Sequence, residues 1–209
     1  DWDDTLCPST VCIEDFGLGA AERAPEGELA EELREYALHA KALIKQARMV
    51  AAEVAIVTNA GEGWVMSSCS TWLPELASEL SAVKIVSARA AWEPYGLSSP
   101  TDWKEYAFRD IVGGFYSKCE DQLWRNIVAI GDAPYEHEAL KRVVLDGPCA
   151  ECCRSKSIRF LVRPSIEVLR RQIDALLLNL EHIVAYDGNL DLQYPAQTEE
   201  EYEDLGASE

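Results

Sequence analysis

The hydrophobic positions of this chain follow two different periods. From residue 29 to residue 50, apolar residues recur at steps of three and four, which predicts one long helix with a single apolar stripe. Other short runs rich in Val and Ile lack that period and are bounded by polar or glycine residues, as is typical of buried strands in parallel sheets. These predicted strands cover residues 54–58, 83–87, 127–130 and 158–162.

Helical patterns separate the predicted strands. They cover residues 62–73, 103–119, 133–145 and 165–184, while residues 6–27 and 89–101 carry the Gly and Pro of loops. The regular exchange of strand and helix predicts an α/β fold, a three-layer, doubly wound parallel sheet of Rossmann-like type with helices on both faces. We expect residues 1–190 to form one domain and the acidic residues 191–209 to form a disordered tail.

Composition and charge limit the classes of function. The chain has 209 residues, 48% of them apolar, and a net charge of −18. Because no basic stripe is present, we expect it to bind neither nucleic acid nor a membrane, and no apolar run approaches the roughly 20 residues that cross a bilayer. Seven cysteines fit reduced thiols in a cytoplasmic protein better than a disulfide framework. A zinc site needs four ligands, and no second cysteine pair or histidine pair accompanies Cys149, Cys152 and Cys153. We therefore assign these cysteines no role.

The candidate chemistry begins at the first residues, where Asp1 and Asp3 precede Thr5. Two close carboxylates repel each other unless a cation neutralises them or one carries a proton. The pair therefore fits a Mg²⁺ site or a nucleophile beside a general acid, although a solvated acidic turn explains it equally well by itself. More polar residues follow the later strands or begin a helix, and these are Thr58, Asn59, Lys104, Asp132 and Glu136.

These residues are expected to meet, because ligands of open α/β sheets bind beyond the carboxyl ends of the strands. Carboxylates suit Mg²⁺, and a hydroxyl with an ammonium group suits a phosphoryl group. Simpler interpretations exist, since Asp132 fits an ordinary helix cap and Thr58 an ordinary turn. Lys84 and Lys118 compete with Lys104, but Lys84 lies inside a predicted strand and Lys118 lies too close to the strand that follows.

Taken together, the motifs resemble those of the haloacid dehalogenase superfamily of phosphatases. The first motif of that family, Asp-x-Asp-x-Thr, matches residues 1–5, and the second, an apolar strand ending in Thr or Ser, matches residues 54–58. The third motif is a lysine, for which Lys104 fits best, and the fourth, Gly-Asp followed by a second acid, matches residues 131–136. The resemblance covers residues 1–136 and implies a Rossmann-like core with a magnesium-dependent phosphatase site.

The resemblance also implies a role for each matched residue. Asp1 would be the nucleophile that forms an aspartyl-phosphate, and Asp3 would be the general acid and then the general base. Mg²⁺, the implied cofactor, would be held by the Asp1 carboxylate, the Asp3 main-chain carbonyl and Asp132. An acid at position 3 favours a phosphatase or a phosphomutase over the dehalogenases and ion pumps of the same family.

The remaining matched residues would bind the substrate. The resemblance implies that Thr58 and Lys104, with Asn59 beside them, contact phosphoryl oxygens. Glu136 would orient Lys104 or support the metal ion through water. The tryptophans are interpreted as packing residues, with Trp2 at the mouth of the site.

Members of this superfamily choose their substrates with inserted caps. Here the insertion point after the first motif holds only the loop and helix of residues 7–52, which implies a small cap and an open active site. An open site suits a bulky phosphomonoester, either a phosphoprotein or a phosphorylated small molecule. The alternative is a catalytically idle relative that serves as a protein-interaction module, while a phosphomutase would need a larger cap.

One feature departs from the family pattern. The first motif should follow an apolar strand at the centre of the sheet, whereas this sequence begins at Asp1. The α-amine then lies next to the nucleophile. We therefore expect this exact chain to be poorly active even if the longer protein is a good enzyme.

Overall fold

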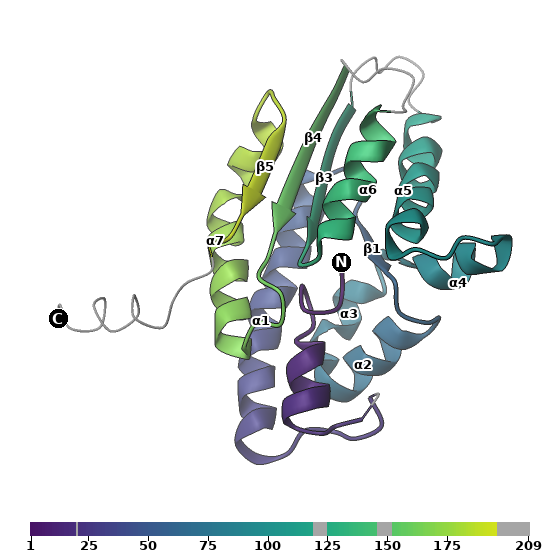
Figure 1. Ribbon diagram of the computed structural model, residues 1–209. Helices are drawn as coiled ribbons and strands as arrows, with labels where there is room; N and C mark the ends of the chain where they lie inside the picture. The colour runs from purple at the N-terminus through teal and green to yellow at the C-terminus, as the bar shows by residue number, and fades with distance from the viewer. Residues whose placement is uncertain (20, 119–124, 146–151, 196–209) are drawn as a thin grey trace.

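The computed structural model describes residues 1–19, 21–118, 125–145 and 152–195 (Figure 1). Its strands are parallel and form two small sheets, which confirms the α/β class. The first sheet pairs β1 (Ala55–Thr58) with β2 (Lys84–Ser87). The second has the order β3 (Arg125–Gly131), β4 (Cys153–Arg159) and β5 (Leu190–Gln193).

Helices surround both sheets (Figure 1). The long helices are α1 (Gly27–Val50), α2 (Trp64–Trp72), α5 (Pro100–Tyr116), α6 (Pro134–Leu145) and α7 (Ile166–Ala185). Short turns of helix are η1 (Val11–Asp15), η2 (Pro74–Leu76), α3 (Ala77–Leu80), α4 (Ala88–Trp92) and η3 (Glu93–Tyr95). In the described residues, α1 packs along α7, while α6 packs on β3 and β4 and has α5 at its side.

The sequence pattern explains how the last long helix is positioned. The Ser165 hydroxyl accepts a hydrogen bond from the Val168 amide at 3.2 Å and caps the first turn. Leu169, Ile173 and Leu176, which recur at helical spacing, are fully buried in the main hydrophobic cluster. The amphipathic stripe thus attaches α7 to the core.

The helix α1 belongs to the same hydrophobic cluster. Its residues Leu33, Tyr36, Ala37 and Ala40 have no exposed surface. We expected residues 7–52 to form a cap insert, but α1 is a structural layer of the domain body that contacts α7. The apolar stripe of a cap helix and that of a core helix have the same period, so the sequence pattern could not separate the two.

Strand β4 differs most from its predicted form. It begins at Cys153 and ends at Arg159, whereas the apolar run predicted residues 158–162. The early part is polar, and Lys156 within it is fully buried. Its ammonium group donates to the Asn126 side-chain oxygen and to the Val184 carbonyl, both at 2.8 Å. Tertiary hydrogen bonds therefore allow a charged residue at a strand position that the hydrophobic pattern excludes.

Three further expectations need correction. Residues 88–95 form α4 and η3, where a loop was predicted, because the Ser87 hydroxyl accepts from the Ala90 amide and caps a short helix. Residues 190–193 form β5 on the edge of β4, although they were mostly assigned to the acidic tail; residues 196–209 lie outside the described residues.

Cys152 is disulfide-bonded, contrary to the expectation of reduced thiols, whereas Cys153 is free and Cys149 lies outside the described residues.

Among the described residues, no helix combines the length and apolar character needed to span a bilayer.

Candidate active site

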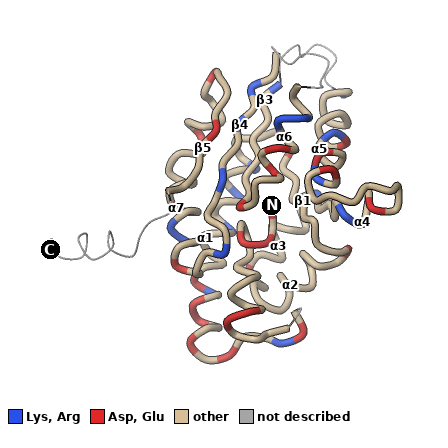
Figure 2. Tube along the Cα trace, viewed as in Figure 1, with Lys and Arg blue, Asp and Glu red and all other residues tan. Residues whose placement is uncertain are grey.

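The first seven residues form a tight turn beside the carboxyl ends of β1 and β3. The Trp2 carbonyl accepts hydrogen bonds from the amides of Leu6 and Cys7, each at 2.9 Å. Asp4 adopts a left-handed conformation with φ of 49° and accepts two hydrogen bonds from Thr10. This turn reverses the chain, so Asp1 and Asp3 both face residues that follow the strands. Acidic segments of the chain accordingly meet near the N-terminus (Figure 2).

Lys104 connects the chain start to β1 and to α6. Its ammonium group lies 2.7 Å from an Asp1 carboxylate oxygen and 3.0 Å from a Glu136 carboxylate oxygen, and it also donates to the Val57 carbonyl. The Lys104 side chain is 1% exposed, and the side chains of Asp1 and Glu136 are 5% and 4% exposed. A buried ammonium group is stable here because two carboxylates and a carbonyl surround it.

The Asp3 carboxylate is held by two other donors. The Thr58 hydroxyl, at the end of β1, donates to one oxygen at 3.1 Å, and the Trp64 indole donates to the other at 2.7 Å. Thr58 is itself fixed, because its hydroxyl oxygen accepts from the Ala60 amide at 2.9 Å. These two hydrogen bonds therefore fix the orientation of the Asp3 carboxylate without a ligand.

Asp132 and Glu136 follow β3 and complete the group of acids. Carboxylate oxygens of Asp1, Asp132 and Glu136 lie within 4.8 Å of one another and could hold a metal ion. Glu136 also accepts from the Ala133 amide at 3.1 Å, which fixes the turn from β3 into α6. Carboxylate oxygens are the kind of ligand that hard cations such as Mg²⁺ prefer. The Asp3 carboxylate, in contrast, is directed to Thr58 and Trp64.

Burial changes the acidity of this group. Together with the neighbouring carboxylates of Glu136 and Asp4, it raises the pKa of Asp132 to about 7. Burial lowers the pKa of Lys104, which the Glu136 carboxylate partly opposes. Burial and the Lys104 ammonium lower the pKa of the Asp1 α-amine to about 5. A cation beside Asp132 would favour its ionised form, so the electrostatics of the site fit a bound metal.

The other predicted residues lie in different places. Asn59 lies next to the site, where its side-chain amide donates to the Pro100 carbonyl at 3.2 Å and ties the end of β1 to the start of α5. Lys84 is exposed at the start of β2, and Lys118 is exposed beyond α5, so neither rival replaces Lys104. Trp2 does not line the mouth of the site; it is fully buried and donates to the Ser68 hydroxyl.

The sequence interpretation missed Trp64, which was counted only as a packing residue. The signal was its position at the first residue of α2, directly after the turn that follows β1. Gly63 makes that turn with φ of 82°, a conformation that side-chain-bearing residues rarely adopt. The Trp64 ring also packs edge to face on Trp72 at 5.6 Å, which holds the indole in place.

We predict that Trp64→Phe lowers the free energy of unfolding by about 1.5–3 kcal/mol, because a hydrogen bond to a charged group contributes about that much. The ring and its packing on Trp72 are retained, while the donor to Asp3 is lost. Urea unfolding measures this effect. Trp72→Phe is the matched control, since that indole donates to the uncharged Arg23 carbonyl and not to the site. Equal losses of stability in the two variants would contradict a specific role for Trp64.

Gly131, at the end of β3, allows the close approach of Glu136. A Cβ atom at residue 131 would lie 2.6 Å from Glu136 Cγ and 2.9 Å from its Cδ. We predict that Gly131→Ala displaces Glu136 from Lys104 and lowers the free energy of unfolding by about 1–3 kcal/mol. Urea unfolding provides the measurement. The control is Gly113→Ala in α5, where the added Cβ meets no atom within 4 Å and helix propensity predicts a gain of up to about 1 kcal/mol.

Comparisons with known proteins found no matching family model, no matching curated protein and no matching solved structure.

Proposed function

We propose that this chain is a phosphohydrolase of the haloacid dehalogenase type, which depends on Mg²⁺ and acts through an aspartyl-phosphate. One observation carries the proposal: the Lys104 ammonium group contacts Asp1, Val57 and Glu136, which belong to distant parts of the sequence. A solvated acidic turn would not gather these groups around a buried lysine. The matched motifs therefore converge on one site, as a phosphoryl-transfer site requires.

The arrangement of secondary structure also supports this class. Parallel strands lie between α1 and α7 on one side and α5 and α6 on the other, in keeping with a three-layer, doubly wound core (Figure 1). Of the proposed active-site residues, Thr58 is the last residue of β1 and Asp132 directly follows β3. Ligands of open α/β sheets bind at such ends.

In the proposed reaction, a carboxylate oxygen of Asp1 attacks the phosphorus atom of a phosphomonoester. The bond between phosphorus and the leaving oxygen breaks, and that oxygen takes its proton from Asp3. Asp3, now ionised, removes a proton from a water molecule, which attacks the phosphorus atom and releases inorganic phosphate and the Asp1 carboxylate. Thr58 and Trp64, which donate to the two oxygens of Asp3, fix the orientation of this side chain.

Charged groups around Asp1 assist this chemistry. Lys104, already 2.7 Å from the Asp1 carboxylate, places its positive charge where phosphoryl oxygens would gather during attack. A bound Mg²⁺ would be held by Asp1 and Asp132 with Glu136 nearby, and it would supply charge neutralisation for the transferring phosphoryl group. Glu136 orients Lys104 through the ion pair at 3.0 Å.

The substrate class follows from the surroundings of the site. A phosphomonoester on a protein or on a small molecule fits an acidic chain better than a polyanion, because the net charge of −18 repels extended negative ligands. No observation favours a catalytically idle interaction module, since Asp3, which an idle relative need not keep, is held by two donors.

The test is hydrolysis of 4-nitrophenyl phosphate with Mg²⁺ and with EDTA. We expect turnover that requires Mg²⁺ and a labile phosphoryl group on Asp1 that can be trapped by acid quenching. Absence of metal-dependent turnover over a broad panel of phosphomonoesters would favour the interaction module.

A further inference from the structure

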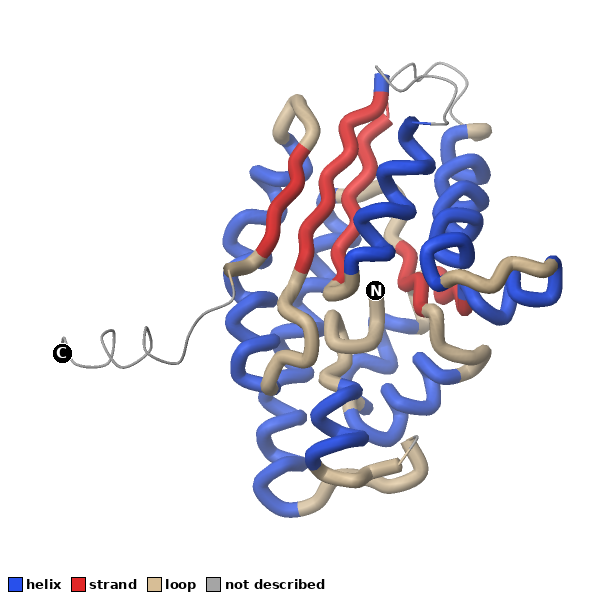
Figure 3. The backbone as a smooth tube through the Cα atoms, viewed as in Figure 1, coloured by secondary structure: helices blue, strands red, loops and turns tan. Residues whose placement is uncertain are grey.

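Tyr135 lies in the first turn of α6, next to Glu136. Pro134 begins this helix, and the hydrogen bond from the Ala133 amide to Glu136 fixes its first turn. Figure 3 shows the N-terminus close to the start of α6 in this view, and Lys104 connects the two through its ion pairs. The local structure therefore holds Tyr135 at the edge of the candidate site.

The ring of Tyr135 lies against the buried lysine of the site. Its centre is 6.0 Å from the Lys104 ammonium group, which is the distance of a cation–π contact. Asp1, Glu136 and the Val57 carbonyl contact the same ammonium group. Lys104 is 1% exposed, whereas Tyr135 is only partly buried, so Tyr135 lies nearer to the opening of the site.

The hydroxyl group of Tyr135 forms a hydrogen bond with the side chain of Asn59, the residue that follows β1. The Oδ1 atom of Asn59 has no hydrogen-bond partner in the described part of the chain, so the Asn59 amide donates and the phenol oxygen accepts. The same amide also donates to the Pro100 carbonyl at 3.2 Å. Both of its N–H groups are then used, and the side chain of Asn59 has no donor left for the phosphoryl oxygen that the resemblance implied.

The proton of the Tyr135 hydroxyl remains available to a ligand. A tyrosine hydroxyl can accept one hydrogen bond and donate another, and it is protonated at neutral pH. Within the described residues, this hydroxyl makes no hydrogen bond besides the one with Asn59. The carboxylates of Glu136, Asp132 and Asp3 act on it electrostatically. The hydroxyl therefore lies among the groups that would surround a bound phosphoryl group.

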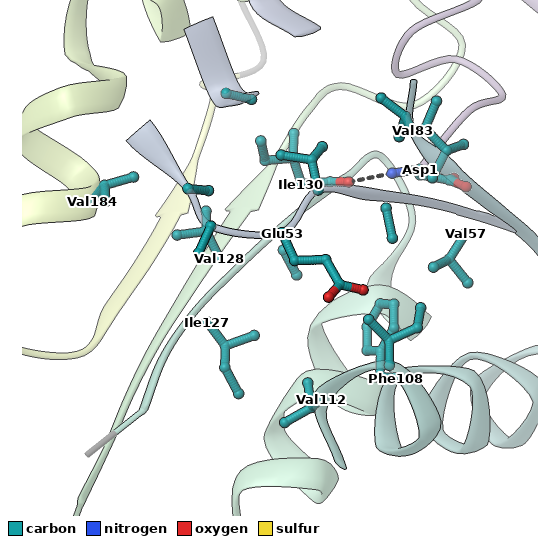
Figure 4. A pocket seen from close by; sticks show the side chains of 18 of the residues that line it. Asp1, Glu53, Val57, Val83, Phe108, Val112, Ile127, Val128, Ile130 and Val184 are labelled. Atoms are coloured by element: carbon teal, nitrogen blue, oxygen red, sulfur yellow. Dashed lines mark hydrogen bonds between the residues drawn. The ribbon is translucent and has the colours of Figure 1, made fainter. Parts of the chain in front are cut away.

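A pocket beside Asp1, which Tyr135 does not line, is unsuited to a phosphoryl group. It has a volume of about 440 Å³ and a mostly apolar lining (Figure 4). At this pocket the Asp1 nitrogen already donates to the Ile130 carbonyl at 2.7 Å. The charged residues of the lining are Asp1 and Glu53, both acidic. Because a phosphoryl group is negative and needs hydrogen-bond donors, we expect it to approach from the side of Tyr135.

We propose that the Tyr135 hydroxyl group, oriented by Asn59, donates a hydrogen bond to an oxygen of the transferring phosphoryl group. This role rests on the proposed phosphatase function. Tyr135 is then a catalytic residue, and Asn59 is a positioning residue that acts through it. A donor aimed at the phosphoryl oxygens stabilises the charge that they carry in the transition state.

The test measures hydrolysis of 4-nitrophenyl phosphate and calorimetric binding of inorganic phosphate, both with Mg²⁺. We expect Tyr135→Phe, which keeps the ring beside Lys104, to lower kcat/KM about tenfold to a hundredfold, with most of the loss in kcat. We expect it to weaken the binding of inorganic phosphate about threefold to tenfold. Tyr95→Phe is the matched control, because Tyr95 is 78% exposed on η3. Its kinetic constants should lie within about twofold of the parent values.

The role of Asn59 is tested with a double variant. We expect Asn59→Ala to lower kcat/KM at least about fivefold, because the Tyr135 hydroxyl loses its orientation. Since Asn59 acts through that hydroxyl, the double variant Asn59→Ala with Tyr135→Phe should lie within about twofold of Tyr135→Phe alone. Urea unfolding checks that each variant is folded. Losses that multiply in the double variant would show that Asn59 acts on the substrate directly and would overturn its orienting role.

Two other outcomes would overturn the proposal, and they are distinguishable. In the first, the parent is active but Tyr135→Phe keeps kcat/KM and phosphate affinity within about twofold of it, which removes the role of Tyr135 and leaves the proposed function intact. In the second, the parent neither hydrolyses phosphomonoesters nor binds inorganic phosphate with Mg²⁺. That result would contradict the proposed function and the role of Tyr135 together.

Discussion

Replacing Asp1 with asparagine is expected to lower kcat for aryl phosphate hydrolysis at least about a thousandfold, because an amide oxygen cannot serve as the nucleophile. The change is nearly isosteric, and the α-amine that bonds to Ile130 remains. Lys104 keeps its contacts with Glu136 and with the Val57 carbonyl. The fold should therefore survive, and circular dichroism and urea unfolding check that it does.

Asp110→Asn is the matched control, since Asp110 is an exposed residue on α5, the helix that carries Lys104. We expect its kcat to lie within twofold of the parent value. Acid-quenched samples should contain a phosphoryl group on the parent protein and on Asp110→Asn, and none on Asp1→Asn. Retention of the phosphoryl group by Asp1→Asn would assign the nucleophile to another residue.

Replacing Lys104 with methionine is expected to lower the free energy of unfolding by about 3–5 kcal/mol in EDTA. Methionine fills most of the same space, but the buried carboxylates of Asp1 and Glu136 then lack their common cation. Breaking a buried ion pair by removing one partner usually has an effect of this size. Urea unfolding followed by tryptophan fluorescence measures it.

Magnesium distinguishes this effect from simple loss of packing. Because Asp1, Asp132 and Glu136 can share a cation, we expect millimolar Mg²⁺ to restore part of the stability that Lys104→Met loses. Lys84→Met, at an exposed position of β2, is the control and should change stability by less than about 0.5 kcal/mol. A loss in Lys104→Met that is identical with and without Mg²⁺ would argue against a metal ion at this group of acids.

The sequence located most of the elements because local pattern is sufficient for them. The helical stripes of α1 and α7 and the short apolar runs of β1, β2 and β3 are signals carried by residues close together in the sequence. Strand β4 was found only in part, since Lys156 interrupts its pattern and is stabilised by partners from β3 and α7. The sequence pattern around Lys156 does not reveal these partners, because they lie far away in the chain.

The candidate site was predictable from residue types at strand ends, but its connections were not. Asp1, Asp3, Thr58, Lys104, Asp132 and Glu136 were named from the motifs, and the structure brings them together around the first turn of the chain. The indole of Trp64 was missed, because a tryptophan in a helix is usually a packing residue and its hydrogen bond to Asp3 exists only in three dimensions.

By itself, the sequence determined the α/β class and the residue types of the site, because hydrophobic period and strand-end chemistry are local properties. Only the tertiary structure decided that Lys104 joins Asp1 to Glu136, that α1 belongs to the core, and that an apolar pocket lies between β1 and β3. These features depend on which surfaces meet, and the free energy that selects them comes from contacts between residues far apart in the chain.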